Sequence, residues 1–207
     1  MTKQQRMSNL VSQLERCHLC PFSFHRLNVV PYAGSIAASA ALIGEAPGKD
    51  EDEQGEAFVG AAGKDMTNTM SEFGLKRDHF FICNILKCRP KKPFAQHDNE
   101  TPTADWAANC FPYLWGQISI VQPKIILLVG MTAAKHVLKL PAGTTMGSIV
   151  GRKGVLDSFG DYEVDWNVKY TIMYHPAALM RPQTPEEKAK KVKNIRDTFH
   201  YIRGQLN

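Results

Sequence analysis

Lys124-Ile-Ile-Leu-Leu-Val129, followed directly by a glycine, is the stretch that decides the fold. A continuous run of branched apolar residues is typical of a strand in a parallel sheet covered on both faces. Similar runs at about 40–44, 79–86 and 170–174 predict three more strands. Because strands alternate with helical patterns, we expect an α/β protein with three α/β/α layers around a mainly parallel four-stranded sheet. The predicted helices cover about 5–16, 63–73, 103–119, 131–138 and 185–203, and a glycine-rich hairpin lies within about 147–170.

The chain has 207 residues, which is enough for a sizeable core, and we expect a single domain over residues 1–207. No apolar run approaches the roughly 20 residues needed to span a bilayer. The start, Met1–Arg6, is polar and unlike a signal peptide. We therefore expect a cytoplasmic protein without membrane contact, and we expect it to be a monomer.

The formal net charge is +5, and the charges are unevenly distributed. Residues 50–53 are all acidic, whereas segments 87–92 and 188–193 are rich in lysine and arginine. Basic segments beside an uncharged crevice suit a partner with a phosphate backbone. A lysine-rich helix is as often only a solvated face, so segment 188–193 alone does not decide between these interpretations.

Five cysteines, an odd number, include the pair in Cys17-His-Leu-Cys20. In an intracellular protein this pattern favours metal binding over disulfides. Cys17, Cys20, Cys88 and Cys110 are the candidate ligands, and binding would join the N-terminal segment to the middle of the chain. Four thiolates suit either a tetrahedral zinc ion or a 4Fe–4S cluster, and the spacing leaves both open. Cys83 lies in an apolar strand, where we expect a buried free thiol.

Two loops at the ends of predicted strands carry groups with catalytic potential. Gly44-Glu-Ala-Pro-Gly48 ends the first predicted strand, and His175-Pro-Ala-Ala-Leu179 follows the last. Loops at the carboxyl ends of parallel strands meet in one crevice, so Glu45 and His175 would face the same space. A P-loop is excluded, because only three residues separate the glycines and Asp50 replaces the Ser/Thr that would bind magnesium.

Phe58, Asn84 and His175 each have both a structural and a ligand-binding interpretation. Phe58 stands in a glycine-bounded loop, where it either stacks on a planar ligand or anchors the core. Asn84 ends a strand, and its amide either caps the backbone or matches the O4/N3–H edge of uracil, which differs from cytosine at the amino group. His175 precedes a proline that fixes its loop, although a lone histidine is more often structural than catalytic.

Together these segments resemble the family 4 uracil-DNA glycosylases, the iron–sulfur branch of the uracil-DNA glycosylase superfamily. The matching segments run in family order from about residue 14 to 181, and their combination is specific although each is weak alone. They are Cys17-His-Leu-Cys20-Pro21, Gly44-Glu-Ala-Pro-Gly48, Ala57-Phe-Val-Gly60 with Ala62-Gly63, Asn84 with Lys87-Cys-Arg-Pro90, Cys110 with Pro112-Tyr-Leu114, Gly130 with Thr132-Ala-Ala134, and His175-Pro-Ala-Ala-Leu179 with Arg181.

The resemblance implies a uracil-DNA-glycosylase-like fold and a monofunctional DNA repair enzyme. Such an enzyme hydrolyses the N-glycosidic bond of uracil in single- or double-stranded DNA, releasing uracil and leaving an abasic site. The resemblance also implies a mainly structural 4Fe–4S cluster on the four candidate cysteines, with zinc as the less favoured alternative. Glu45 would position the attacking water, and His175 would donate a hydrogen bond to the leaving base. The base would be bound by Gly44, Ala46, Phe58 and Asn84.

The same interpretation predicts where the DNA strand is held. Arg89, Arg181 and the helix start at Thr132 would contact phosphates. Leu179, with Met180, would fill the space that the base leaves.

Residues 91–100 form a longer link than the family usually has between the Cys-Arg-Pro motif and the next helix. A related branch traps the sugar of uracil covalently through a histidine in this region, which makes His97 a candidate. The basic motif that flanks that histidine is absent here. The alternative function is therefore a uracil-DNA binding protein that traps its site covalently or turns over little. A metal-stapled scaffold without chemistry is disfavoured, because Glu45, Asn84 and His175 are all present.

Overall fold

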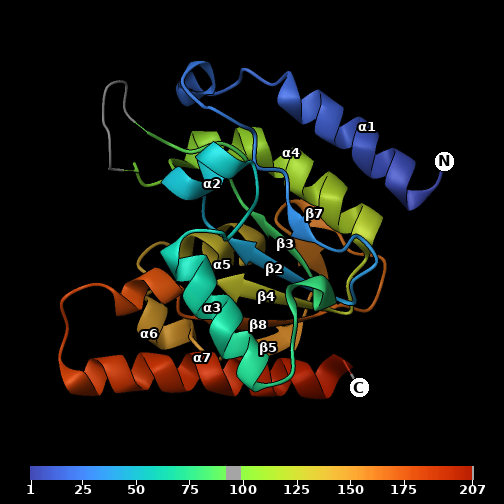
Figure 1. Ribbon diagram of the computed structural model, residues 1–207. Helices are drawn as coiled ribbons and strands as arrows, with labels where there is room; N and C mark the ends of the chain where they lie inside the picture. Colours follow the sequence, from blue (N-terminus) through green and yellow to red (C-terminus); the bar gives the residue numbers. More distant parts are fainter. Residues whose placement is uncertain (92–98, 207) are drawn as a thin grey trace.

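The computed structural model describes residues 1–91 and 99–206 and places one sheet between two layers of helices (Figure 1). Four five-residue strands lie parallel in the order β3-β2-β4-β8. They confirm the four predicted strands and the α/β class. Their bounds are β2 (Ala40–Gly44), β3 (Phe80–Asn84), β4 (Ile125–Val129) and β8 (Lys169–Met173).

The sheet is larger than the predicted four strands. β1 (Ala33–Gly34) pairs antiparallel with β3, and β5 (Lys153–Val155) pairs antiparallel with β8, which gives six strands. The two added strands are only two and three residues long and lie at the edges. They lack an apolar run because an edge strand does not need to bury both of its faces.

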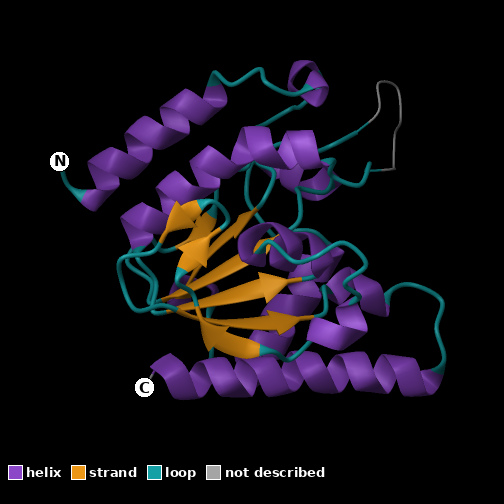
Figure 2. Cartoon of the chain, turned by 180° about the vertical axis from the view of Figure 1, so that it is seen from behind, coloured by secondary structure: helices purple, strands orange, loops and turns teal. Residues whose placement is uncertain are grey.

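The apolar runs are continuous because both faces of the sheet are covered (Figure 2). Successive strand residues point to opposite faces. Ile126 and Leu128 belong to the core shared with α1, α4 and α5, whereas Ile125 and Leu127 belong to the core shared with α3 and α7. The helices are α1 (Lys3–Glu15), α4 (Ala104–Val121) and α5 (Met131–Leu138) on one face, and α3 (Ala61–Glu72) and α7 (Pro185–Leu206) on the other.

The remaining elements are short and lie between these. The hairpin expected within 147–170 is the two-stranded sheet of β6 (Ser158–Phe159) and β7 (Tyr162–Glu163). No described helix has the length and apolar content to cross a bilayer. The other short elements are α2 (Lys49–Gln54), α6 (Met146–Ile149) and the 3-10 turns η1 (Pro21–Phe24), η2 (Arg77–His79) and η3 (Pro176–Leu179).

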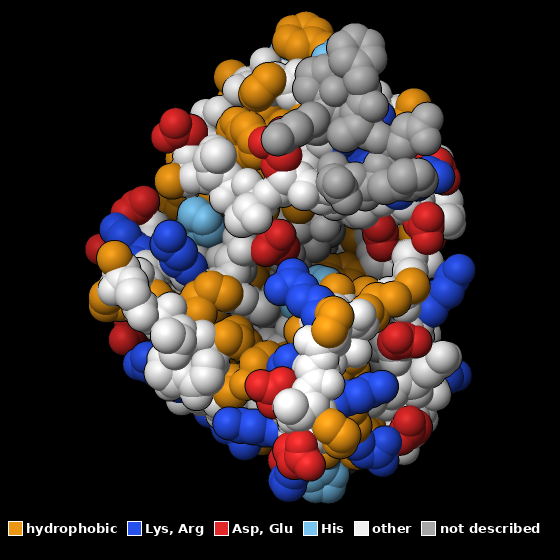
Figure 3. All heavy atoms as spheres, turned by 90° about the vertical axis from the view of Figure 1, so that its left-hand side faces the viewer, with side chains coloured by type: hydrophobic (Ala, Val, Ile, Leu, Met, Phe, Trp, Pro, Cys, Tyr) orange, Lys and Arg blue, Asp and Glu red, His pale blue; other side chains and the backbone are white. Residues whose placement is uncertain are grey.

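The strand order creates a crevice at one end of the sheet. From β2 the chain moves to β3 on one side, and it then crosses back to β4 on the other. The loops after β2 and β4 therefore part at their carboxyl ends, which is where open α/β sheets bind ligands. The carboxyl ends point to the left in Figure 1, and Figure 3 shows that side hollowed and bordered by side chains of both charges.

Candidate active site

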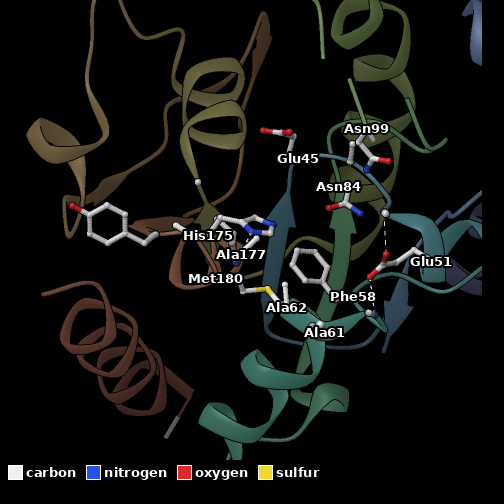
Figure 4. Close-up of a pocket in the computed structure, with 18 of the residues that line it drawn as sticks. Glu45, Glu51, Phe58, Ala61, Ala62, Asn84, Asn99, His175, Ala177 and Met180 are labelled. Carbon is white, nitrogen blue, oxygen red and sulfur yellow. Dashed lines mark hydrogen bonds between the residues drawn. The ribbon is translucent and has the colours of Figure 1, made fainter. Parts of the chain in front are cut away.

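A cavity of about 890 Å³ lies at the carboxyl ends of the parallel strands (Figure 4). It brings together residues that are far apart in the sequence and come from the loops after β2, β3 and β8 and from the loop before α3. Six of the ten predicted catalytic, base-binding and DNA-binding residues line it. These are Glu45, Ala46, Phe58, Asn84, His175 and Arg181.

Gly44 does not line the cavity, but it lies directly against two of the residues that do, Asn84 and Phe58. A Cβ atom built on Gly44 would lie 2.4 Å from Asn84 Oδ1 and 2.4 Å from Phe58 Cζ. Only a glycine fits there, so its role is to let the amide and the ring approach one another. Asn84 is paired with Gly44 in the sheet and is 2% exposed, so its amide belongs to the rigid floor.

Glu45 directly follows β2, and Thr132 is the second residue of α5, the helix that follows β4. The Thr132 hydroxyl donates a hydrogen bond to Glu45 Oε2. Thr132 does not line the cavity, so the structure places it as a support for the carboxylate, whereas the prediction had it contact phosphate. The carboxylate keeps a second oxygen, Oε1, that can bind water in the cavity.

His175 follows β8 and is held in one tautomer. Its Nδ1 accepts a hydrogen bond from the Ala177 backbone N–H at 3.2 Å. Burial lowers the pKa of the imidazole, and the opposing influence of Glu45 does not outweigh it. The ring is therefore neutral near pH 7 with its hydrogen on Nε2, which makes Nε2 a donor. Its centroid lies 6.0 Å from that of the Phe58 ring.

Leu179 and Met180, the two residues predicted to fill the space that the base leaves, are placed differently relative to the cavity. Leu179 packs against the core shared with α3 and α7 and does not line the cavity. Met180 lines the cavity and is 61% exposed. Gln183 holds this turn by donating to the Ala178 and Leu179 carbonyls at 3.1 and 3.0 Å. The exposed apolar side chain of this turn that lines the cavity is therefore that of Met180, whereas Leu179 is partly buried against the core.

Arg89 is 4% exposed and does not line the cavity. Its Nε donates to Asn99 Oδ1 at 2.7 Å, and Asn99 Nδ2 donates to the Pro47 carbonyl at 3.0 Å. The structure thus places Arg89 inside the protein as a brace for the loop after Glu45, not on the surface where the prediction had it contact phosphate. Asn99 lines the cavity and was not predicted; nothing in the sequence distinguishes it from a solvated loop residue.

The four candidate metal ligands lie in one neighbourhood between η1, the loop after β3 and α4. Cys20, Cys88 and Cys110 are buried, and Cys17 is half-buried. Arg26 Nη1 donates to Cys88 Sγ at 3.2 Å, and Asn109 Nδ2 lies 3.8 Å from Cys20 Sγ. Cys83 is buried in β3 and belongs to the hydrophobic core, as predicted.

Burial raises the pKa values of Cys20 and Cys88, and it raises that of Cys110 to about 12. Thiolates in such a place require a positive centre, which a metal supplies. Within residues 1–91 and 99–206, no three or more His, Cys, Asp or Glu side chains form a group arranged for a metal ion.

Comparison with known proteins identifies the family. The model of the uracil DNA glycosylase superfamily matches residues 31–199. This chain belongs to that superfamily. It is 35% identical over 192 residues to the type-4 uracil-DNA glycosylase of Archaeoglobus fulgidus, covering 91% of each chain. It is 36% identical over 220 residues to that of Sulfurisphaera tokodaii, covering 100% of this chain and 93% of the relative. It is also 34% identical over 177 residues to that of Pyrobaculum aerophilum, covering 84% of this chain and 85% of the relative.

Within this member of the superfamily, the matched region contains the whole cavity but begins after Cys17 and Cys20. The full-length relative from Sulfurisphaera tokodaii covers the N-terminal segment as well. His97 lies outside the described residues, so its predicted role stays a hypothesis.

Proposed function

We propose that this protein hydrolyses the N-glycosidic bond between uracil and deoxyribose in DNA, acting in DNA repair and leaving an abasic site. The observation that carries the proposal is the convergence of Glu45, Phe58, Asn84 and His175 on one cavity. A carboxylate, an aromatic ring, a buried amide and a neutral imidazole are the groups that this reaction requires. The match to the superfamily model and to type-4 uracil-DNA glycosylases supports it.

Recognition begins with a uracil that leaves the base stack, which costs a few kcal/mol. Stacking on Phe58 would recover about 1–3 kcal/mol. The Asn84 amide would form hydrogen bonds with the O4/N3–H edge of uracil. Because this amide is buried, a base without matching groups would leave its donor and acceptor unsatisfied. Met180 at the rim would fill the vacated space, and Arg181 would contact a phosphate.

Bond cleavage leaves positive charge on the sugar and negative charge on uracil, as at other glycosidic centres. Glu45, held by Thr132, would stabilise the sugar cation and orient a water molecule. The electron pair of the broken bond leaves with uracil, the water oxygen bonds to the sugar carbon, and the proton that the water releases neutralises the uracil anion. His175 would donate its Nε2–H to the uracil oxygen on which charge develops, the logic of an oxyanion hole.

Cys17, Cys20, Cys88 and Cys110 would hold a 4Fe–4S cluster, with a zinc ion as the alternative that four thiolates also allow. A cluster would bind each of the four thiolates through a separate iron. The chemistry that such a cluster supplies here is structural. The cysteines would fasten the segment after α1 to α4, while Arg26 and Asn109 would donate hydrogen bonds to the sulfurs.

The direct test is alkaline cleavage of an oligonucleotide that contains one uracil, after incubation with the protein. Wild-type protein should cause strand cleavage at the uracil. Glu45→Ala should lose uracil release while DNA binding persists. Glu53→Ala, a change at an exposed carboxylate that does not line the cavity, should leave both unchanged. Full activity of Glu45→Ala would remove Glu45 from the mechanism.

The same assay separates hydrolysis from trapping. A DNA adduct that survives denaturation in place of free uracil would establish the binding or trapping alternative. Asn84→Asp should impair the selection of uracil, because a carboxylate lacks the amide donor. Unchanged selection would show that Asn84 does not recognise the base.

A further inference from the structure

Phe58 has a backbone conformation that its residue type rarely adopts. Its φ is +57°, in the left-handed region, where a side chain crowds the backbone. Such a conformation persists only where its surroundings impose it. The side chains that hold this backbone, those of Glu51 and Arg77, lie on two other elements.

Glu51, in α2, binds the backbone on the C-terminal side of Phe58. Its Oε1 accepts hydrogen bonds from the Val59 and Gly60 N–H groups at 3.1 and 2.9 Å. Its Oε2 accepts from the Gly48 N–H at 2.9 Å. An ordinary glutamate at this position of a helix would need only the Gly48 contact, to cap its own N-terminus. The second oxygen joins the loop after β2 to the loop of Phe58.

Arg77, in η2, binds two backbone carbonyl groups of the same loop, those of Ala57 and Phe58. Its Nη1 donates to the Phe58 carbonyl at 2.9 Å, and its Nη2 donates to the Ala57 carbonyl at 2.6 Å. Nη2 also pairs with Glu56 Oε1 at 3.1 Å. A planar guanidinium can hold two neighbouring carbonyls in a fixed geometry, which a lysine ammonium does not.

We propose that Glu51 and Arg77 are positioning residues that hold the Phe58 ring in its base-stacking position before DNA arrives. The proposal rests on the role given to Phe58 above. The two charged side chains bind three consecutive peptide groups around Phe58, because Arg77 donates to the Ala57 and Phe58 carbonyls and Glu51 accepts from the Val59 and Gly60 N–H groups. The ring then meets the flipped base without first having to be ordered.

This role predicts which kinetic quantity changes. Stacking on Phe58 is present both when the flipped base is bound and in the transition state, so it acts as uniform binding. Losing the order of the loop should therefore weaken DNA binding and spare the rate of bond cleavage. Glu45 and His175, which meet developing charge, should show the reverse pattern.

The experiment uses single-turnover release of uracil from an oligonucleotide at a series of protein concentrations. Glu51→Gln keeps one acceptor oxygen and cannot hold both loops. It should raise the half-saturating concentration about tenfold, with the maximal rate changed less than about threefold. Arg77→Lys should act in the same direction. Glu53→Gln, on the same helix but exposed and outside the cavity, is the matched control and should behave as wild type.

A double-mutant cycle with Phe58→Ala decides between positioning and general support of the fold. If Glu51 acts through the ring, Glu51→Gln in the Phe58→Ala background should add less than about twofold. A full, additive effect in that background would overturn the proposal. If Glu51→Gln does not fold, the cycle of Arg77→Lys with Phe58→Ala gives the same decision.

The outcomes also separate this inference from the proposed function. No effect of Phe58→Ala alone would remove the stacking role and the inference with it. An effect of Phe58→Ala together with wild-type behaviour of Glu51→Gln and Arg77→Lys would overturn only the inference. Absence of uracil release by the wild-type protein would overturn the proposed function itself.

Discussion

At the scale of the residue, Glu45 depends on a neighbour that comes from a distant element, helix α5. The Thr132 hydroxyl donates to Oε2, so the carboxylate has one fixed oxygen. Thr132→Val keeps the shape and removes the donor. A hydrogen bond to a charged group is worth about 1.5–3 kcal/mol, so we expect the maximal rate of uracil release to fall about 10- to 100-fold. Single-turnover kinetics measure this rate.

Thr132→Ser restores the hydroxyl and should recover most of the rate. Affinity for uracil-containing DNA should be unchanged in both variants. Weaker DNA binding of Thr132→Val at an unchanged rate would instead return Thr132 to the phosphate contact predicted from the sequence.

His175 carries a second prediction at this scale. Burial lowers its pKa, so the imidazole should titrate below the ordinary value of about 6.5. NMR titration of ¹⁵N-histidine protein, assigned by comparison with His175→Gln, measures the pKa and the tautomer. We expect a neutral ring protonated at Nε2 at pH 7. A titration above 6.5, or a hydrogen on Nδ1, would contradict the donor role.

The same pKa shift has a consequence for stability. Below about pH 6.5 the unfolded chain binds a proton at residue 175 that the folded protein does not bind. This contribution to stability is therefore complete above about pH 6.5 and is lost as the pH falls toward the lower folded pKa. His175→Gln should remove that part of the pH dependence in urea unfolding.

Single residues also show where prediction from sequence succeeds. Glu45, Asn84 and His175 could be predicted because each ends or directly follows a recognisable strand, and strand ends meet in a parallel sheet. The inward orientation of the Arg89 side chain could not be predicted. It depends on a hydrogen bond to Asn99, which lies in a loop without a recognisable sequence pattern. Glu51 belongs to an acidic run that resembles a solvated face until its contacts across two loops are known.

At the scale of the element, α3 packs against the Phe58 loop with no spare room. A Cβ atom on Gly63, in the first turn of α3, would lie 2.1 Å from the Phe58 carbonyl oxygen. Elsewhere in a helix, replacing glycine by alanine stabilises by about 0.5–1 kcal/mol. Gly63→Ala should instead destabilise, because the contact is with backbone that cannot yield without moving Phe58. The free energy of unfolding measured in urea should fall, and the protein concentration that half-saturates uracil release should rise.

Gly204→Ala in α7 is the matched change, since nothing lies within 4 Å of its added Cβ. It should leave activity unchanged and increase stability by a few tenths of a kcal/mol or more, less than in a helix centre because the helix ends at Leu206. Equal behaviour of the two variants would show that α3 and the Phe58 loop are not tightly joined.

Elements were predictable in proportion to their burial. The four central strands and the five long helices follow from apolar runs and helical periodicity. β1 and β5 could not be predicted, because strands of two and three residues pair by backbone hydrogen bonds at the sheet edge and have no side-chain pattern. The left-handed backbone at Phe58 is likewise invisible in the sequence, since distant side chains impose it.

At the scale of the whole molecule, the cysteine neighbourhood joins the N-terminal part of the chain to the body. α1 packs on α4, and the segment after it carries Cys17 and Cys20. Asp52 adds a second attachment, because its buried carboxylate accepts from the Leu27 and Asn28 N–H groups at 3.0 and 3.3 Å. The sheet lies on the other side of α4 from α1 (Figure 1).

A cluster in this place should therefore stabilise one region more than the rest. We expect purified protein to be brown, with a broad absorption band near ~400 nm. Cys20→Ala should lose the colour, whereas Cys83→Ala should keep it, because Cys83 belongs to the core of the sheet. In Cys20→Ala, amide hydrogen exchange should accelerate in residues 3–30 while β2, β4 and β8 stay protected.

This contrast distinguishes a structural cluster from the two alternatives. A colourless wild-type protein with one bound zinc would refute the cluster. Uniform acceleration of exchange across the sheet in Cys20→Ala would mean that the metal supports the whole fold. Local acceleration with uracil release retained would instead show that the N-terminal attachment and the catalytic crevice are separate structural units, joined through α4.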